Sequence, residues 1–209
     1  MAFPHNITRL EALSDGVFAF AATLMVVSLG LEESWLANES RGLQLITFGG
    51  SFFVLIALWV VHYNYFRRSG YVDYWIITYN SVLLFVVLYY VFPLKSLINA
   101  WLGQEPMSEQ GLADLFGWYG LGFLLIFLCF SLMYHRAYKK TKSLSRSVEL
   151  LFYSRHFAIY VGTAALSIGA AALGIGIRYG FPGFLYAILG PLCYWHSMYF
   201  EKKYPKSLQ

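Results

Sequence analysis

The sequence predicts an all-α membrane protein with six transmembrane helices. Of its 209 residues, 58% are hydrophobic and 12% are charged, whereas an ordinary soluble domain carries about 25% charged residues. Six stretches are mostly apolar and close to the roughly 20 residues that a helix needs to cross a bilayer. They are residues 8–31, 43–66, 74–98, 113–137, 155–177 and 181–200. Because these stretches fill nearly the whole chain, we expect a single domain over residues 1–209.

The first stretch opens with charge. Arg9, Glu11 and Asp15 precede an apolar run that ends near Gly30. A signal peptide has a basic start and a small-residue cleavage site, and neither is present here. We therefore expect a retained first helix with polar residues at its beginning.

The second and third stretches carry small and polar residues at defined places. Residues 49–51 (Gly-Gly-Ser) allow close helix approach in the second stretch, which ends at the basic pair 67–68. The third contains Asn80, Ser81 and, near its end, Pro93. We assign no role to these two polar residues from the sequence alone.

The last three stretches are rich in small residues. Glycines recur over residues 117–122, and the fourth stretch ends in the basic run 136–146, which predicts the longest loop on that side. Glycine and alanine dominate the fifth stretch, which indicates tight packing against its neighbours. The sixth begins at Pro182, a favourable residue for a first helical turn.

Basic residues predict the orientation. One set of ends and loops holds Arg9, Arg67, Arg68, Arg136, Lys139, Lys140, Lys142, Arg146, Arg155, Lys202, Lys203 and Lys206, and the other holds only Arg41, Lys95 and Arg178. The positive-inside rule then places both termini in the cytoplasm of a multi-pass protein in a cell membrane. The net charge of +4 lies in short loops between spans, so it does not predict a nucleic-acid partner.

Signatures of enzymes and cofactor sites are absent from the sequence. We find no His-Glu-x-x-His, no Gly-x-Ser-x-Gly and no phosphate loop, and we expect no catalytic residue, bound metal or cofactor. The potassium-filter sequence Thr-Val-Gly-Tyr-Gly is missing as well. Cys129 and Cys193 fall inside predicted spans and are expected to be buried thiols rather than a disulfide.

At 100° per residue, the first helix has two distinct faces. One is an apolar stripe with a single hydroxyl, and it holds Leu13, Gly16, Phe20, Thr23, Leu24, Val27 and Leu31. The other holds Asp15, Ala19, Ala22 and Val26, and its small residues suit packing on a neighbouring helix. In a monomer the stripe would be core or face lipid. At the axis of an oligomer it would line a pore and form a hydrophobic constriction.

A polar network is expected at the start of the first helix. If the first two helices are antiparallel, Trp59 and His62 lie at the depth of Ser14 and Asp15. Together with Arg9 they would satisfy polar groups that are costly to bury alone. The simplest role for such a network is to hold the helices together.

The segment Arg9-x-x-x-Leu13-Ser14-Asp15-Gly16, followed by Val-Phe-Ala-Phe-Ala-Ala-Thr-Leu-Met-Val, resembles the transmembrane protein 175 family. These proteins are endosomal/lysosomal and prokaryotic potassium channels. Their motif is Arg-x-x-x-Phe-Ser-Asp, from which Leu13 departs. Trp59 and His62 look like the tryptophan and histidine of the family's second helix, which join the arginine in a stabilising network.

The resemblance implies a function and a site. A single six-helix unit is similar to the prokaryotic form, which implies a homotetramer in the plasma membrane whose first helix lines a central pore. On this chain the constriction then consists of Phe20, Leu24 and Val27, with Thr23 as a hydroxyl layer that favours potassium among monovalent cations. Phe20 stands where the family usually has isoleucine or leucine.

Two other functions remain open from the residues. A proton-conducting or proton-coupled transporter would use Asp15 and His62 as relay groups, although discontinuous helices and paired carboxylates within the membrane, which are typical of transporters, are not evident. The other is a non-conducting membrane scaffold, or an enzyme of a type that the sequence does not identify, and in it the first helix would face lipid.

Overall fold

The computed structural model describes residues 7–27, 41–103 and 107–204, and these form helices and turns without a strand. The elements are α1 (Ile7–Val27), α2 (Arg41–Ser69), α3 (Tyr74–Trp101), α4 (Glu109–Lys140), α5 (Leu144–Ala172), the 3-10 turn η2 (Ile177–Tyr179), α6 (Phe181–Phe184), the 3-10 turn η3 (Leu185–Ile188) and α7 (Leu189–Lys203). The all-helical class predicted from the sequence is confirmed for the described residues.

Four helices are long and apolar enough to cross a membrane by length and composition. They are α1, the part of α2 from Gln44, α3 and α4. The fifth and sixth predicted crossings correspond to α5 and to the segment from α6 to α7, and they stay predictions. Residues 28–31, the predicted end of the first span, lie outside the described residues.

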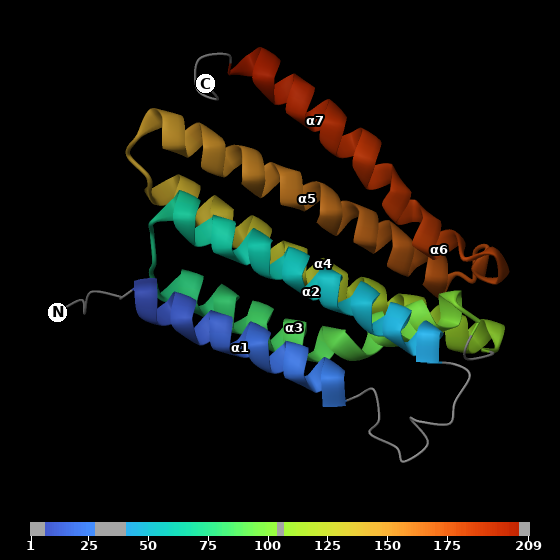
Figure 1. Ribbon diagram of the computed structural model, residues 1–209. Helices are drawn as coiled ribbons and strands as arrows, with labels where there is room; N and C mark the ends of the chain where they lie inside the picture. The colour runs from blue at the N-terminus through green and yellow to red at the C-terminus, as the bar shows by residue number, and fades with distance from the viewer. Residues whose placement is uncertain (1–6, 28–40, 104–106, 205–209) are drawn as a thin grey trace.

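The helices run up and down beside one another, with α1 and α7 at opposite edges of the bundle (Figure 1). The first residue of α1 and the last of α7 lie at the same end. This end also carries basic residues from three other helices, namely Arg67, Arg68, Lys139, Lys140 and Arg146. We refer to it below as the basic end.

The fifth helix differs from its predicted limits. It begins at Leu144 rather than at residue 155 and ends at Ala172 rather than at residue 177. Arg146, from the basic run that indicated a loop, is on the helix. One turn further, Glu149 lies 3.2 Å from Arg68 of α2 in an ion pair. The Arg68 guanidinium also lies 4.2 Å from the ring centroid of Tyr153. The connection to α4 is therefore only residues 141–143, and the long basic loop predicted there is wrong.

The sixth segment is broken rather than continuous. Gly176 and Gly180 have φ angles of 62° and 68° on either side of η2, a conformation that glycine adopts without steric cost. The chain then passes through α6 and η3 before α7 begins at Leu189. A regular span over residues 181–200 is thus only partly correct.

The core lies where α4 packs against α3 and α5. Two glycines of α4 permit this close approach: a Cβ on Gly122 would come 2.5 Å from the Tyr90 ring, and one on Gly120 would come 2.7 Å from Ile168. Ser131 and Ser154 join α4 to α5, because each hydroxyl donates to the other's backbone carbonyl, at 2.9 and 3.1 Å. The close approach thus comes from glycines of α4, whereas a Cβ on Gly162 or Gly169 of α5 would meet nothing within 4 Å. The tight packing predicted from the glycines of the fifth span is therefore not found at these two positions.

Aromatic side chains fill the interior between α2, α4 and α5. The rings of Tyr65 and Tyr134 meet at right angles, 4.9 Å apart, and neither side chain is exposed. Phe130 and Phe157 continue the cluster with centroids 5.6 Å apart. Edge and tilted ring contacts of this kind add to the stabilisation that burial alone supplies.

Candidate functional site

α1 is attached to the bundle by one face only. Ser14, Phe18, Ala21 and Met25 are its buried residues, and their spacing of three or four places them along one side of the helix. This side faces α2 and α3. Of the face predicted to pack on a neighbouring helix, Asp15 contacts α2 and Ala22 packs against the core, whereas Ala19 and Val26 are exposed. Within one subunit that prediction therefore holds only in part.

The predicted pore stripe lies away from the buried face. The side chains of Phe20 and Val27 are 55% and 62% exposed. Thr23 is also exposed and Leu24 is half-buried. The four residues therefore form a mostly apolar surface on α1, the helix at one edge of the bundle (Figure 1).

Thr23 presents an oxygen atom on this surface. Its Oγ1 donates to the carbonyl of Ala19 in the preceding turn, at 3.0 Å. A hydroxyl that has used its hydrogen in this way keeps lone pairs on its oxygen. Thr23 thus presents an oxygen atom whose lone pairs could coordinate a cation.

A buried chain of hydrogen bonds joins the first three helices. The side-chain amide of Asn80 in α3 donates to Ser14 Oγ of α1 at 3.0 Å, and its oxygen lies 2.8 Å from His62 Nε2 of α2. Because that oxygen can only accept, His62 donates from Nε2. Ser14 and Asn80 are completely buried and His62 is 2% exposed, so each bond satisfies a group that water does not reach.

Asp15 makes a separate contact with the second helix. The indole nitrogen of Trp59 donates to Asp15 Oδ1 at 2.8 Å. Asp15 is exposed and Trp59 is half-buried. Four of the five predicted network residues thus fall into two separate groups. Ser14 is linked to His62 through Asn80, and Asp15 bonds to Trp59. Arg9 lies exposed in the first turns of α1, and its place in the network stays a prediction.

The sequence reasoning missed Asn80 as the residue that connects this network. A signal was present, because an uncharged amide within an apolar span must find a hydrogen-bond partner in the protein. Its two partners come from helices 18 and 66 residues away along the chain. The residue type therefore predicts a bond, but the spacing does not reveal the partners.

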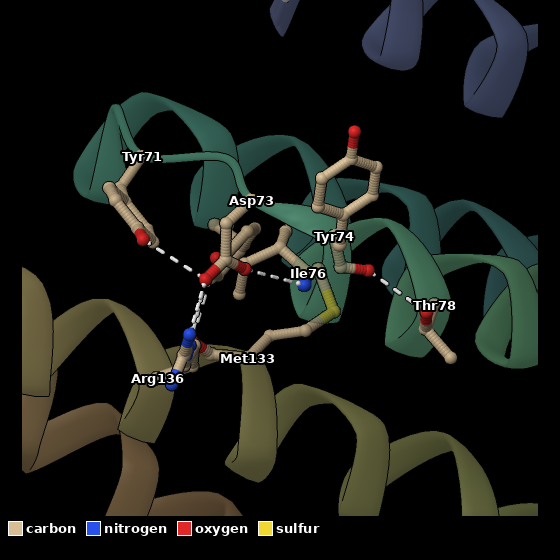
Figure 2. Close-up of polar contacts among 8 residues, drawn as sticks. Tyr71, Asp73, Tyr74, Ile76, Thr78, Met133 and Arg136 are labelled. Atoms are coloured by element: carbon tan, nitrogen blue, oxygen red, sulfur yellow. Dashed lines mark hydrogen bonds and ion pairs between the residues drawn. The ribbon is translucent and has the colours of Figure 1, made fainter. Parts of the chain in front are cut away.

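A second polar cluster lies at the basic end, between α3 and α4 (Figure 2). Asp73 precedes α3 and accepts the backbone N–H of Ile76 at 3.0 Å, the helix-capping contact. The same carboxylate accepts from Tyr71 at 3.0 Å and from Arg136 of α4 at 2.8 Å. Partial burial raises the pKa of Asp73, but these hydrogen bonds and the charge of Arg136 outweigh it and hold the pKa below its ordinary value.

The cluster is a tie between helices rather than a site facing the pore stripe. Burial, together with the bond to Asp73, raises the pKa of Tyr71, so its hydroxyl keeps its proton and remains a donor. Arg136, which the sequence suggested only as a marker of orientation, is thereby an interhelical contact.

Comparison with known proteins gives consistent matches. The model of a family described as endosomal/lysosomal potassium channel TMEM175 matches residues 9–93, which cover α1, α2 and most of α3. A potassium channel from Marivirga tractuosa is 40% identical over 147 residues, which are 63% of this chain and 60% of that protein. A potassium channel from Chamaesiphon minutus is 28% identical over 66% of this chain and 67% of its own length. The match to the Marivirga protein thus spans less than two thirds of that relative.

Two solved structures share the fold. A variant of the potassium channel MtTMEM175, crystallised with a nanobody–MBP fusion protein, superposes with a TM-score of 0.76 at 29% identity and covers 93% of both chains. A lysosomal potassium-selective channel TMEM175 homologue from Chamaesiphon minutus has a TM-score of 0.59 at 22% identity, over 88% of this chain and 97% of that one. The second match is evidence for the fold alone. These relatives are named as channels and not as enzymes.

Proposed function

Because the chain belongs to the TMEM175 family, we propose that it forms a homotetrameric, potassium-preferring cation channel whose pore is lined by α1. The names of its relatives support potassium as the permeant ion. No P-loop filter is required, since the constriction is built from side chains on one helix. The channel needs no catalytic group and no cofactor.

The observation that carries this proposal is the exposed stripe on α1. Phe20 and Val27 leave large apolar surfaces uncovered on a helix at the edge of the bundle (Figure 1). Four copies of α1 around an axis cover this surface and narrow the passage. In the proposed tetramer, rings of Phe20, Leu24 and Val27 form a constriction that conducts only when it is wide enough to be wetted.

Thr23 supplies the polar layer of the proposed pore. Its hydroxyl hydrogen is bonded within α1, so its oxygen can replace part of the hydration shell of a passing cation. One hydroxyl ring replaces little of that shell. Potassium loses its water more easily than sodium, and modest potassium preference follows.

The polar contacts of α1 fix its position rather than touch the ion. In the proposal, Arg9, Ser14, Asp15, Trp59 and His62 hold the base of α1 on α2, with Asn80 as the link to α3. This arrangement keeps Phe20, Thr23, Leu24 and Val27 free to face the axis.

The proposed topology has six crossings with both termini in the cytoplasm of a prokaryotic plasma membrane. The basic residues that gather at the end shared by α1 and α7 support this orientation. In this topology, α5 is the fifth crossing and the broken segment from α6 to α7 is the sixth.

Ion flux from proteoliposomes tests the proposal. Purified protein should release potassium faster than sodium, and Phe20→Ala should raise the flux or reduce the preference, because it removes a ring of the constriction. Phe184→Ala is the matched control, since Phe184 is also a heavily exposed phenylalanine (71%) but lies on α6, away from α1. Equal effects of the two substitutions would contradict a pore lined by α1.

The same vesicles separate the channel from a proton-coupled transporter. The relatives' names do not favour that alternative, and Asp15 and His62 take part in different hydrogen bonds. Potassium flux that persists without a proton gradient is expected. Flux that requires a proton gradient would instead favour the transporter.

A further inference from the structure

Two histidines face each other across α5 and α7, far from the pore stripe. The ring centroids of His156 and His196 are 5.6 Å apart. The ring of Phe152 packs against both, with centroids 5.3 Å from His156 and 5.0 Å from His196. Phe200 covers His196 from the next turn of α7, at 5.5 Å. The pair is thus held inside an aromatic cluster, away from the polar network of α1.

Three nitrogen atoms of this pair are inaccessible to solvent and lack a hydrogen-bond partner within the described part of the chain. They are Nδ1 of His156 and both Nδ1 and Nε2 of His196. Buried imidazole nitrogens are normally paired, and an unpaired one points to a group that the surrounding residues do not supply. A metal ion is one such group, because neutral imidazole is a common metal ligand.

The separation of the rings fits a shared ion. With metal–nitrogen bonds of about 2.0–2.1 Å, two imidazoles on one tetrahedral ion have centroids roughly 5–5.5 Å apart. The observed 5.6 Å requires only a small adjustment of the side chains. Nitrogen ligands of this type select zinc, copper or nickel over potassium, magnesium or calcium.

We propose that His156 and His196 bind a divalent transition metal ion that links α5 to α7. The described residues contain no group of three or more histidine, cysteine or acidic residues able to hold a metal, so the protein supplies two ligands and water or another small molecule completes the shell. Such a site is open, and it binds more weakly than a closed structural zinc site.

Two further features bear on this site. A pocket of about 330 Å³ is lined by His196, Trp195 and Tyr199, so it reaches one member of the pair. His196 lies two turns before Lys203, the last residue of α7. The charge of Arg155 acts on His196 and opposes any cation there, but Arg155 is exposed, so solvent screens its effect.

Copper binding tests the proposal directly. The tag-free full-length protein is titrated with Cu²⁺ and followed by electron paramagnetic resonance, in which coordinated nitrogens split the signal. We expect one site per chain with splitting from two imidazole nitrogens. His156→Phe and His196→Phe should each weaken this site at least tenfold, while the phenyl ring preserves the aromatic packing around it.

His135→Phe is the matched control, because His135 is also a half-buried histidine but lies on α4. A second measurement uses Zn²⁺, which should raise the melting temperature of the wild type and the control but not of the two test variants, because a ligand that binds only the folded chain stabilises it. Absence of a two-nitrogen signal in the wild type, or equal loss in all three variants, would overturn the proposal.

Discussion

α1 and α4 are both apolar helices of the same bundle, yet they are held by different forces. α4 packs along its length against α3 and α5, through glycines and an aromatic interior, and many of its residues are buried. α1 has four buried residues and is tied to its neighbours by a few hydrogen bonds. Of these two helices, the one proposed to carry function thus has the lesser packing, and specific polar contacts fix its place while Phe20 and Val27 stay uncovered.

The largest expected effect comes from disturbing the packing of α4. Gly122→Val places a branched side chain against the buried ring of Tyr90, where even a Cβ would approach to 2.5 Å. We expect destabilisation of about 3 kcal/mol, at the upper end of overpacking effects, measured as a fall in the thermal midpoint in detergent. Gly117→Val is the control, because no atom lies within 4 Å of a Cβ at that position. Similar midpoints for the two variants would show that α4 is not held by close packing.

A smaller effect is expected where α1 is tied to the bundle. Asn80→Leu keeps the side-chain size but leaves the buried N–H of His62 without its acceptor, which costs about 1–3 kcal/mol. Hydrogen exchange should quicken in α1 more than in α4, because Ser14 loses its link to α3.

Ser81→Ala is the control for this change, since Ser81 is exposed and its hydroxyl donates only to Ile77 of its own helix. If exchange in α1 is unchanged by Asn80→Leu, then packing rather than the polar network holds that helix, and the contrast with α4 disappears.

The smallest expected effect concerns the contact between Asp73 and Arg136 at the basic end. The pKa of Asp73 is lower in the folded chain than its unfolded value of 3.8. The ionised carboxylate therefore stabilises the fold fully above pH 3.8, and this stabilisation is lost as the pH falls through the lower pKa of the folded state. Asp73→Asn keeps a good helix cap but removes the charge facing Arg136. We expect the wild type to be more stable than this variant by less than about 1 kcal/mol above pH 5.

This difference should vanish as the pH is lowered below 3.8, and unfolding measured across that range checks the sign. Asp114→Asn on the exposed start of α4 serves as the control. A difference for Asp73→Asn that grows toward low pH would contradict the depressed pKa.

Prediction from the sequence succeeded where a property belongs to one helix and failed where it depends on a partner. Hydrophobic length predicted α1 to α4, and the helical wheel predicted a stripe that includes Phe20 and Val27. The start of α5 was missed, because the basic run up to Arg146 is typical of a loop. In the structure this part of the helix is tied to another helix by the ion pair of Glu149 with Arg68. The buried face of α1 was missed for the same reason, since the wheel separates faces but does not say which one meets α3.

The chain of bonds from Ser14 through Asn80 to His62 also has a consequence for how the protein is made. During synthesis α1 enters the membrane long before α3, because Ser14 and Asn80 are 66 residues apart. Ser14 does not wait unsatisfied, since its hydroxyl already donates to Leu10 of its own helix. Asn80 carries an amide that its own helix is not seen to satisfy, and it meets both of its partners already inserted. His62 gains its bond to Asn80 only when α3 arrives, so α3 is the helix that completes the contacts among the first three.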